Sequence, residues 1–362
     1  MRINWWNIEL GEEEQEAIQK AIMTKHIAQG EITEEFEERL ARYLKVSYAV
    51  AVPNGTQALS LAYMALGIGV GDEIITSNRT FVATAHAALL LGGKVKAVDV
   101  KDNQTIDENL IESMITKQTK AIVPVHMNGV ACNMEEIFRI AKKYNLEVVE
   151  DACQAFGSKD KSGKFLGTFG RFGCFSLGLA KLLTTGQGGV VVAHTREDCE
   201  LLKRIRNQGV FDVRKERDYC LKAYNFKFND MQAAIGIEQL KKMDAKIANS
   251  IALYEAYRKE LYGRVEFLES DIANGEIPMR CIIMVKNNSA LKEYLQTKGI
   301  GTSYESPSLN HCVHLGICGE YPKSERFHNE MLILPSGPNQ DLKNVAIVCD
   351  VITQWWQNKG ES

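Results

Sequence analysis

The sequence lacks the cysteine pairs that mark metal and redox sites. Its nine cysteines include no CxxC pair, and an odd number cannot all be joined in disulfides. Because thiols stay reduced in the cytoplasm, this cysteine usage favours a cytoplasmic protein. No metal site is predicted.

An export signal and a membrane segment are missing from the N-terminal stretch. MRINWWNIELGEEEQEAIQK has no cationic region followed by an apolar core, as a secretory signal would have. It also has no run of about 20 apolar residues, the length that a membrane-spanning helix needs. Neither export nor membrane insertion is predicted.

An excess of positive charge is absent as well. The 43 lysines and arginines are balanced by 46 aspartates and glutamates, and the net charge is -3. Nucleic acids and anionic membranes attract basic proteins, so we expect neither as a partner. There is also no internal repeat. With 362 residues, 45% of them hydrophobic, the chain can form two domains, or one large domain with a smaller companion.

Strands alternate with helices through the first part of the chain. The predicted strands are 47–52, 73–76, 94–100, 120–125 and 146–150, and the predicted helices are 11–24, 33–45, 58–69, 82–92, 107–115 and 133–144. Such alternation is typical of the α/β class, in which helices cover both faces of a mostly parallel sheet. Ligands of these sheets bind at the carboxyl ends of the strands.

The pattern changes near residue 229. Residues 230–261 carry apolar side chains at helical spacing, which predicts one long helix that bridges two units. After it come predicted strands at 265–268 and 278–285 and predicted helices at 290–299 and 342–357. We therefore predict a large domain over residues 1–245 and a small α+β domain over residues 246–362.

Lys181 is the first candidate for chemistry. It lies in FGCFSLGLAKLLTTGQGGVVVA (172–193), on a connection between two predicted apolar strands. A buried ammonium group is costly, and reaction of the amine with an aldehyde is one way to remove the charge. The alternative is that the side chain simply extends from a loop into solvent.

A phosphate site is the second candidate. In Asn54-Gly55-Thr56-Gln57, a glycine turn opens a helix, and the free N–H groups at a helix N-terminus attract phosphate. Thr56 is alternatively an ordinary helix cap. Ser176, which precedes Lys181, is a possible second phosphate donor.

Two further candidates follow predicted strands. Glu150 and Asp151 end an apolar strand, where acids serve as metal ligands, catalytic bases or partners of a buried cation. Asp151 is better positioned to meet a ligand nitrogen, and a structural salt bridge is the alternative. Phe81 ends a strand-to-helix loop and could cover a planar ring, although aromatic residues there often belong to the core.

Together these features match one cofactor. A phosphate site, a carboxylate for a ring nitrogen, an aromatic cover and a lysine for an aldehyde are what pyridoxal 5'-phosphate requires. The carboxylate keeps the pyridine nitrogen protonated, and the lysine binds the aldehyde and later moves protons.

The chain is similar to the DegT/DnrJ/EryC1/StrS family of sugar aminotransferases, members of the fold type I aspartate aminotransferase superfamily. Six segments carry the resemblance in order: AQGEITEEFEERLARYL, NGTQALSLAYMALGIGVGDEIITSNRTFVATAHA, AIVPVHMNGVACNMEEI, VVEDACQAFGS, GCFSLGLAKLLTTGQGG and YNFKFNDMQAAIGIEQL. It implies a large domain with a mostly parallel seven-stranded sheet between helices, and a small α+β C-terminal domain.

The resemblance also assigns roles to single residues. It implies Lys181 as the Schiff-base lysine, Asp151 as the partner of the pyridinium nitrogen, and Gln154 beside the phenolic oxygen of the ring. Phe81 would stack on the ring, and the phosphate would be held by Gly55, Thr56, Gln57 and Ser176. Asn225 matches an asparagine that reaches the cofactor phosphate of the neighbouring subunit, which implies a homodimer with shared active sites.

The sequence departs from the family pattern at several positions. Leu182 follows the lysine where many relatives have asparagine, and Gln187 stands where TGEGG is usual. Asn54 replaces a common serine, and Lys227 replaces a frequent arginine. The segment SYESPSLNH (303–311) lacks the histidine–tyrosine pair of many sugar-nucleotide transaminases, so the roles of Tyr304 and His311 stay open.

The expected reaction is a ping-pong transamination. L-glutamate would give its amino group to the cofactor, and the pyridoxamine 5'-phosphate form would aminate a keto-sugar, here a nucleotide-linked 4-keto or 3-keto 6-deoxysugar. A keto-inositol aminotransferase, a sugar dehydratase and a non-catalytic regulator are the alternatives. The dehydratases have histidine at the lysine position, whereas this chain has Lys181. Trp5, Trp6 and residues 303–316 are candidates for the acceptor pocket, but they do not identify the sugar.

Overall fold

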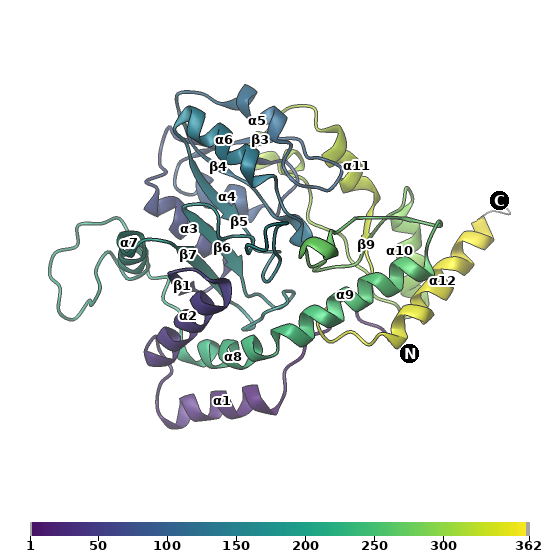
Figure 1. Cartoon of the computed structure of the whole chain (residues 1–362), viewed down its shortest axis with the longest axis horizontal. Coiled ribbons are helices and arrows are strands. Elements are labelled where there is room, and N and C mark those ends of the chain that lie inside the picture. The colour runs from purple at the N-terminus through teal and green to yellow at the C-terminus, as the bar shows by residue number, and fades with distance from the viewer. Residues whose placement is uncertain (1, 360–362) are drawn as a thin grey trace.

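A seven-stranded sheet forms the centre of the larger unit in the computed structural model, which describes residues 2–359 (Figure 1). Its strands are β1 (Tyr48–Val52), β2 (Glu73–Ser77), β3 (Lys94–Val98), β4 (Thr119–Val123), β5 (Glu147–Asp151), β6 (Phe172–Ser176) and β7 (Gly189–Ala193). They lie in the order β1-β7-β6-β5-β4-β2-β3, and only β7 runs antiparallel to its neighbours. The expected mostly parallel, seven-stranded sheet is confirmed.

Helices cover both faces of this sheet. They are α2 (Glu31–Leu44), α3 (Gly55–Ala65), α4 (Ala83–Leu89), α5 (Glu108–Met114), α6 (Met134–Tyr144), α7 (Arg196–Arg206) and α8 (Asp230–Lys241). Helix α1 (Glu12–Met23) packs on α8 and not on the sheet. Because successive strand residues point to opposite faces, Val50 packs with α3, α4 and α7, whereas Ala51 packs with α2 and α8. On that second face, Ile122 and Val148 pack with α5 and α6.

The C-terminal unit contains a small antiparallel sheet. Its elements are α9 (Met243–Glu260), β8 (Glu266–Phe267), β9 (Ile282–Met284), α10 (Asn288–Thr297), α11 (Pro322–Glu330), β10 (Met331–Ile333) and α12 (Lys343–Lys359), and the strand order is β10-β9-β8. A separate apolar core fills this unit and includes Leu253, Ile283, Leu291 and Val348. We keep the division at residue 245 as a proposal, with the addition that Ile3 of the N-terminal stretch packs into this C-terminal core.

The predicted single helix over 230–261 is wrong. The chain forms two helices, α8 and α9, which meet at Lys242. The Lys242 ammonium pairs with Glu14 at 3.0 Å and with Glu13 at 3.1 Å, both on α1. No proline or glycine marks this break, and therefore apolar spacing alone could not locate it.

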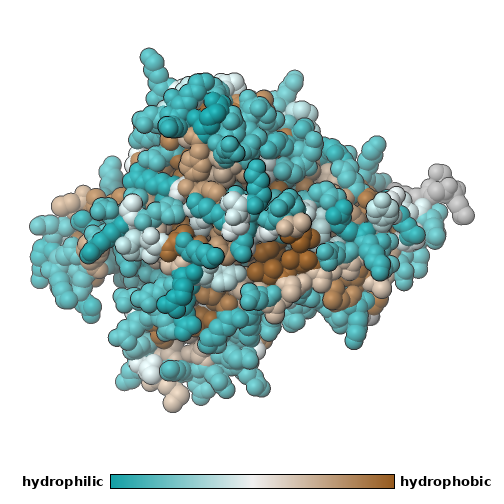
Figure 2. All heavy atoms as spheres, in the orientation of Figure 1, coloured by the Kyte–Doolittle hydropathy of each residue, from teal (hydrophilic) through white to brown (hydrophobic). Residues whose placement is uncertain are grey.

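The surface is mainly polar. Figure 2 shows that apolar side chains gather near the middle of the face in view, where the two units meet, while polar side chains cover the periphery. Over residues 2–359, we find no helix with both the length and the apolar character to cross a membrane.

Candidate active site

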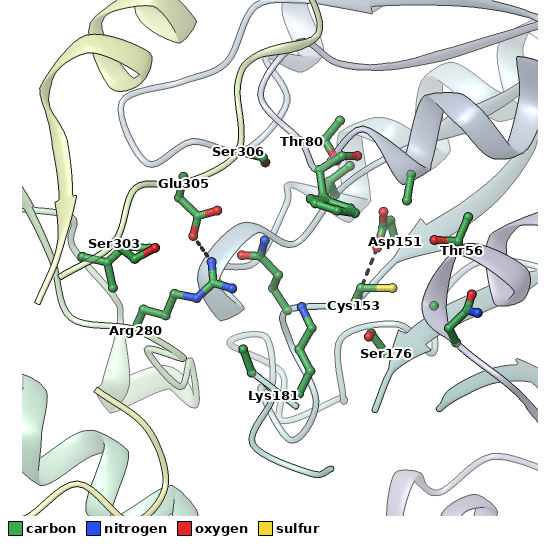
Figure 3. A pocket seen from close by; sticks show the side chains of 18 of the residues that line it. Thr56, Thr80, Asp151, Cys153, Ser176, Lys181, Arg280, Ser303, Glu305 and Ser306 are labelled. Atoms are coloured by element: carbon green, nitrogen blue, oxygen red, sulfur yellow. Dashed lines mark hydrogen bonds and ion pairs between the residues drawn. The ribbon is translucent and has the colours of Figure 1, made fainter. Parts of the chain in front are cut away.

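A cavity of about 450 Å³ opens at the carboxyl ends of the parallel strands (Figure 3). Segments that follow β1, β2, β4, β5 and β6 form one side of it, as expected for this sheet topology. The other side comes from the C-terminal unit, with Arg280, Ser303, Tyr304, Glu305 and Ser306. The volume lies in the range of small-molecule sites.

The N-terminus of α3 faces this cavity. The helix begins at Gly55, three residues before the predicted start, because the Asn54 side chain caps it by accepting a hydrogen bond from the Gln57 N–H at 2.9 Å. Thr56 is therefore not the cap, and its hydroxyl lines the cavity. Among the described residues, the N–H groups of Gly55 and Thr56 have no hydrogen-bond partner. They are the free donors that an anion needs.

Gly55 allows α3 to approach β6 closely. A Cβ at this position would lie 2.9 Å from Cβ of Ser176 and 3.0 Å from Sγ of Cys153. Any larger residue would push the helix N-terminus away from the Ser176 hydroxyl. The glycine thus brings the free N–H groups and two hydroxyls, of Thr56 and Ser176, to one end of the cavity.

Asp151 ends β5 and points its carboxylate into the cavity. Its Oδ2 accepts a hydrogen bond from the Thr84 hydroxyl at 2.7 Å. Its Oδ1 accepts one from the Cys153 backbone N–H at 3.1 Å (Figure 3). These two bonds fix the carboxylate and still leave each oxygen a lone pair for a ligand N–H.

Glu150 has a structural role. Because strand residues alternate, its side chain lies on the opposite face, fully buried. It accepts hydrogen bonds from the backbone N–H groups of Gly167, Phe169 and Gly170 and pairs with His126 Nε2 at 2.8 Å. The structural salt bridge considered for this acidic pair applies to Glu150 and not to Asp151.

Lys181 lies on the connection between the antiparallel strands β6 and β7, and its amine points into the cavity and not into solvent (Figure 3). Burial, together with the positive charge of Arg280, lowers the pKa of Lys181 to about 8. A lysine with such a pKa is a nucleophile near neutral pH, because a sizeable fraction of the amine is unprotonated.

Phe81 and Gln154 also line the cavity. Phe81 is 55% exposed and stands at the edge, so it does not belong to the core. Gln154 is buried, and its side-chain oxygen accepts a hydrogen bond from the Asn128 N–H at 2.9 Å. That bond leaves the amide NH₂ of Gln154 as the donor available to a ligand.

Of the remaining candidate residues, some line the cavity and others lie outside it. Trp5 and Tyr304 line the cavity. Trp6 instead is buried and donates a hydrogen bond to the Leu179 carbonyl, and His311 pairs with Glu325 on α11. Asn225 is exposed and does not line the cavity of its own chain.

The structure shows the surroundings of Leu182 and Gln187, two residues that depart from the family pattern. Leu182 is buried in the core beneath the sheet, where an apolar side chain fits. The Gln187 side chain is exposed, and the carbonyl of this residue accepts hydrogen bonds from the Thr185 hydroxyl and from Gln232 at 2.7 Å.

An ion pair between Arg280 and Glu305 was not anticipated. It forms the wall of the cavity opposite Asp151 (Figure 3). One signal was present in the sequence, because an arginine interrupts the otherwise apolar run PMRCIIMV (278–285). Over the described residues, we find no group of three or more histidine, cysteine or acidic side chains that could hold a metal ion.

Comparison with known proteins gives consistent results. The family model of the DegT/DnrJ/EryC1/StrS aminotransferases matches residues 8–353. GDP-perosamine synthase of Escherichia coli O157:H7 is 33% identical, with 92% of each chain covered. UDP-4-amino-4,6-dideoxy-N-acetyl-beta-L-altrosamine transaminase of Campylobacter jejuni is 31% identical, with 93% of each chain covered.

Solved structures of similar fold cover almost the whole chain. DesV of S. venezuelae superposes with a TM-score of 0.92 at 28% identity, covering 98% of each chain. Helicobacter pylori PseC, an aminotransferase of pseudoaminic acid biosynthesis, gives 0.93 at 25% identity, with 99% of this chain and 100% of that chain covered. The fold is that of the fold type I transferases. The chain belongs to the DegT/DnrJ/EryC1/StrS aminotransferase family and is an aminotransferase.

Proposed function

We propose that this protein transfers the amino group of L-glutamate to a nucleotide-linked keto-sugar, with pyridoxal 5'-phosphate as cofactor, in amino-sugar biosynthesis. One observation carries the proposal: Lys181, Asp151 and the free N-terminus of α3 line a single cavity. The names of the E. coli and C. jejuni relatives refer to nucleotide-linked amino sugars, and this supports the substrate class.

The residues fit the proposed cofactor. The unpaired N–H groups of Gly55 and Thr56, with the Thr56 and Ser176 hydroxyls, suit a phosphate. Asp151 offers free lone pairs to a pyridinium N–H, and Phe81 offers an aromatic face at the cavity edge. Lys181 supplies an amine to an aldehyde.

When bound, pyridoxal 5'-phosphate supplies an electron sink that makes the proton next to the substrate nitrogen acidic. Asp151 holds the ring nitrogen protonated, and its hydrogen bond from Thr84 keeps the carboxylate in place. Gln154, oriented by Asn128, donates toward the phenolic oxygen. The Lys181 amine would take a proton from carbon next to the substrate nitrogen and return one to carbon within each half-reaction.

We further propose a homodimer with shared active sites. Asn225 is exposed and lies outside the cavity of its own chain, as a residue that serves the partner's site would. Large apolar side chains are also exposed on α1 and in the segment before Asn225, among them Ile22, Met23, Phe211 and Tyr219.

We also propose a cytoplasmic location. All nine cysteines are free thiols, as is usual in a reducing compartment.

Amino transfer from L-glutamate to a panel of keto-sugar nucleotides and keto-inositols tests this function. We expect turnover with at least one keto-sugar nucleotide, a visible absorbance band of the bound cofactor, and loss of both in Lys181→Ala. Activity on keto-inositols alone would replace the substrate class. A Lys181→Ala variant that retains turnover would contradict the proposed chemistry, and a wild-type protein without any turnover would indicate a regulator.

A further inference from the structure

Asn128 lies where the two units of the chain meet beside the cavity. It belongs to the short 3-10 helix η1 (Met127–Gly129), which follows β4, and only 1% of its surface is exposed. Its backbone has φ 53° and ψ 22°, in the left-handed region that residues other than glycine, asparagine and aspartate rarely adopt. Its backbone N–H, its carbonyl and both ends of its side-chain amide all make hydrogen bonds.

The backbone N–H of Asn128 sets the orientation of the Gln154 side chain. It donates to Oε1 of Gln154 at 2.9 Å, which leaves the NH₂ group of that amide for the cavity. Because a side-chain amide has an acceptor end and a donor end, this bond decides which end a ligand meets. The direction of the N–H depends in turn on the left-handed conformation of Asn128.

The side chain of Asn128 holds the C-terminal unit. Its Oδ1 accepts a hydrogen bond from the Arg280 N–H at 2.8 Å, and its Nδ2 donates to the Arg280 carbonyl at 3.1 Å. The Asn128 carbonyl also accepts a bond from the Met279 N–H at 3.3 Å. One side-chain amide thus pairs with the backbone of Arg280 as a neighbouring strand would. Since the Arg280 side chain lines the cavity, this pairing fixes where its charge stands.

The two units lie in close contact next to Asn128. A Cβ on Gly129 would clash with the carbonyl oxygen of Ile277, and the Ser158 hydroxyl accepts a hydrogen bond from the Ile277 N–H at 3.0 Å. Segment 277–280 is therefore fixed on the large unit at several points. Asn128 differs from the other contacts because it also bonds a side chain that lines the cavity.

Two properties of the active site depend on these bonds. Gln154 offers its NH₂ group to the phenolic oxygen of the proposed cofactor. The positive charge of Arg280 acts, after burial, to lower the pKa of the Lys181 amine. The first group comes from the large unit and the second from the C-terminal unit, and Asn128 contacts both.

We propose that Asn128 is a positioning residue that keeps Gln154 of the large unit in register with Arg280 of the C-terminal unit. Its backbone N–H orients Gln154, and its side-chain amide places Arg280. A shift of the C-terminal unit at Arg280 therefore reaches the cofactor oxygen through one residue. The proposal rests on the transaminase function given above and adds how the two units keep their shared cavity aligned.

Two substitutions separate the backbone role from the side-chain role. Glycine adopts the left-handed conformation freely, so Asn128→Gly keeps the bond to Gln154 and loses the bonds to Arg280. Alanine disfavours this conformation, so Asn128→Ala weakens both contacts. Asn145 has the same φ of 53° at the exposed end of α6, outside the cavity. Asn145→Gly and Asn145→Ala are therefore the matched controls.

The visible absorbance of the bound cofactor reports the orientation of Gln154. An N–H donor stabilises the ionised phenolic oxygen, and it does so most when the nitrogen linked to Lys181 carries no proton. Gln154→Ala should therefore raise the pH midpoint of the absorbance change by about 1 pH unit. Asn128→Ala should show at least roughly half of this rise, because its N–H turns away, and Asn128→Gly none. In the Gln154→Ala background, Asn128→Ala should add no further rise.

The cofactor-free protein tests the contact with Arg280. Hydrogen exchange followed by mass spectrometry should show the Arg280 N–H exchanging ~10-fold faster in both Asn128 variants, because the loss of its acceptor makes local opening easier. The uptake of pyridoxal 5'-phosphate should also level off at higher pH than in the wild type, since the charge of Arg280 is no longer held beside Lys181. The Asn145 variants should match the wild type in both measurements.

The outcomes separate the positioning role from the transaminase function. If the wild type is active and the Asn128 variants keep its absorbance midpoint and its exchange rate, the positioning role is wrong while the function stands. A midpoint that rises equally in Asn128→Gly and Asn128→Ala, or that rises in the Asn145 variants, also contradicts the role. If the wild type binds no cofactor, the proposed function is wrong, and hydrogen exchange alone decides whether Asn128 holds Arg280.

Discussion

Lys181 and Arg280 are electrostatically coupled, and this coupling should be visible in the pH dependence of cofactor binding. The amine attacks an aldehyde only when unprotonated, and the pKa of Lys181 is lowered from 10.5 to about 8 by burial and then by Arg280. The rate at which cofactor-free protein takes up pyridoxal 5'-phosphate should therefore rise with pH and level off above about 8. Stopped-flow absorbance measures this rate.

Arg280→Gln removes a neighbouring positive charge, which raises the pKa of Lys181. The rise in the rate should then move to higher pH than in the wild type. A pH profile that is the same in both proteins would show that Arg280 does not act on the lysine amine.

Asp151 provides the second prediction for a single residue. Asp151→Asn keeps the size of the side chain and its hydrogen bond from Thr84, but it loses the charge that holds the ring nitrogen protonated. We expect turnover to fall at least ~100-fold, because a side chain that controls protonation in an active site typically contributes at least that factor to the rate. Asp198→Asn, which loses an ion pair with Arg171 outside the cavity, is the control and should stay near wild-type turnover. Equal turnover in both variants would contradict the role of Asp151.

Local sequence located some site residues and not others. Lys181, Asp151 and Thr56 each stand next to an apolar strand or a glycine turn, so strand ends alone place them on one rim. Arg280 and Glu305 come from the C-terminal unit, and their approach to Lys181 depends on how the two units pack. Such long-range packing leaves no periodic signal in the sequence.

Strand β5 shows how one element serves both the fold and the site. Asp151 faces the cavity, and its neighbour Glu150 anchors the 167–170 loop and His126 from the other face. Glu150→Gln removes the charge of a fully buried ion pair, and we expect a loss of roughly 3–5 kcal/mol of unfolding free energy. Urea denaturation followed by circular dichroism measures the unfolding free energy of both proteins.

Glu147→Gln, in the same strand, is the matched control for Glu150→Gln. Glu147 is half-buried and pairs with Arg171 near the surface, so loss of its charge should change the unfolding free energy by about 1 kcal/mol or less. If the two variants have equal stability, the anchoring role of Glu150 is wrong.

Element boundaries were predicted where an apolar run ends at turn residues, and they were missed where a side-chain cap or a tertiary contact sets them. The alternation of strands and helices up to residue 150 is confirmed, because each strand is a short apolar run between turn residues. Helix α3 starts before its apolar face does, because Asn54 caps it. The break between α8 and α9 lies at Lys242, whose ion pairs are with a distant helix, and α7, α11 and β10 were not predicted.

For the whole molecule, shared active sites predict complementation between two defective chains. Lys181→Ala lacks the amine, and Asn225→Ala lacks the group that we propose for the partner's phosphate site. A hybrid dimer would contain one complete site, with Lys181 from one chain and Asn225 from the other. Mixing the two proteins under conditions that exchange subunits should therefore give more turnover than either alone. A mixture no more active than the separate proteins would contradict shared sites.

Borohydride reduction of the holoenzyme, followed by peptide mass mapping, directly identifies the lysine that binds the cofactor. The reagent makes the link between an amine and the cofactor aldehyde permanent, so the modified residue can be located. We predict that the peptide containing Lys181 carries the added mass, and that prior reaction with L-glutamate prevents the modification because the aldehyde has become an amine. A modification on a different lysine, or none on any lysine, would contradict the proposed active site.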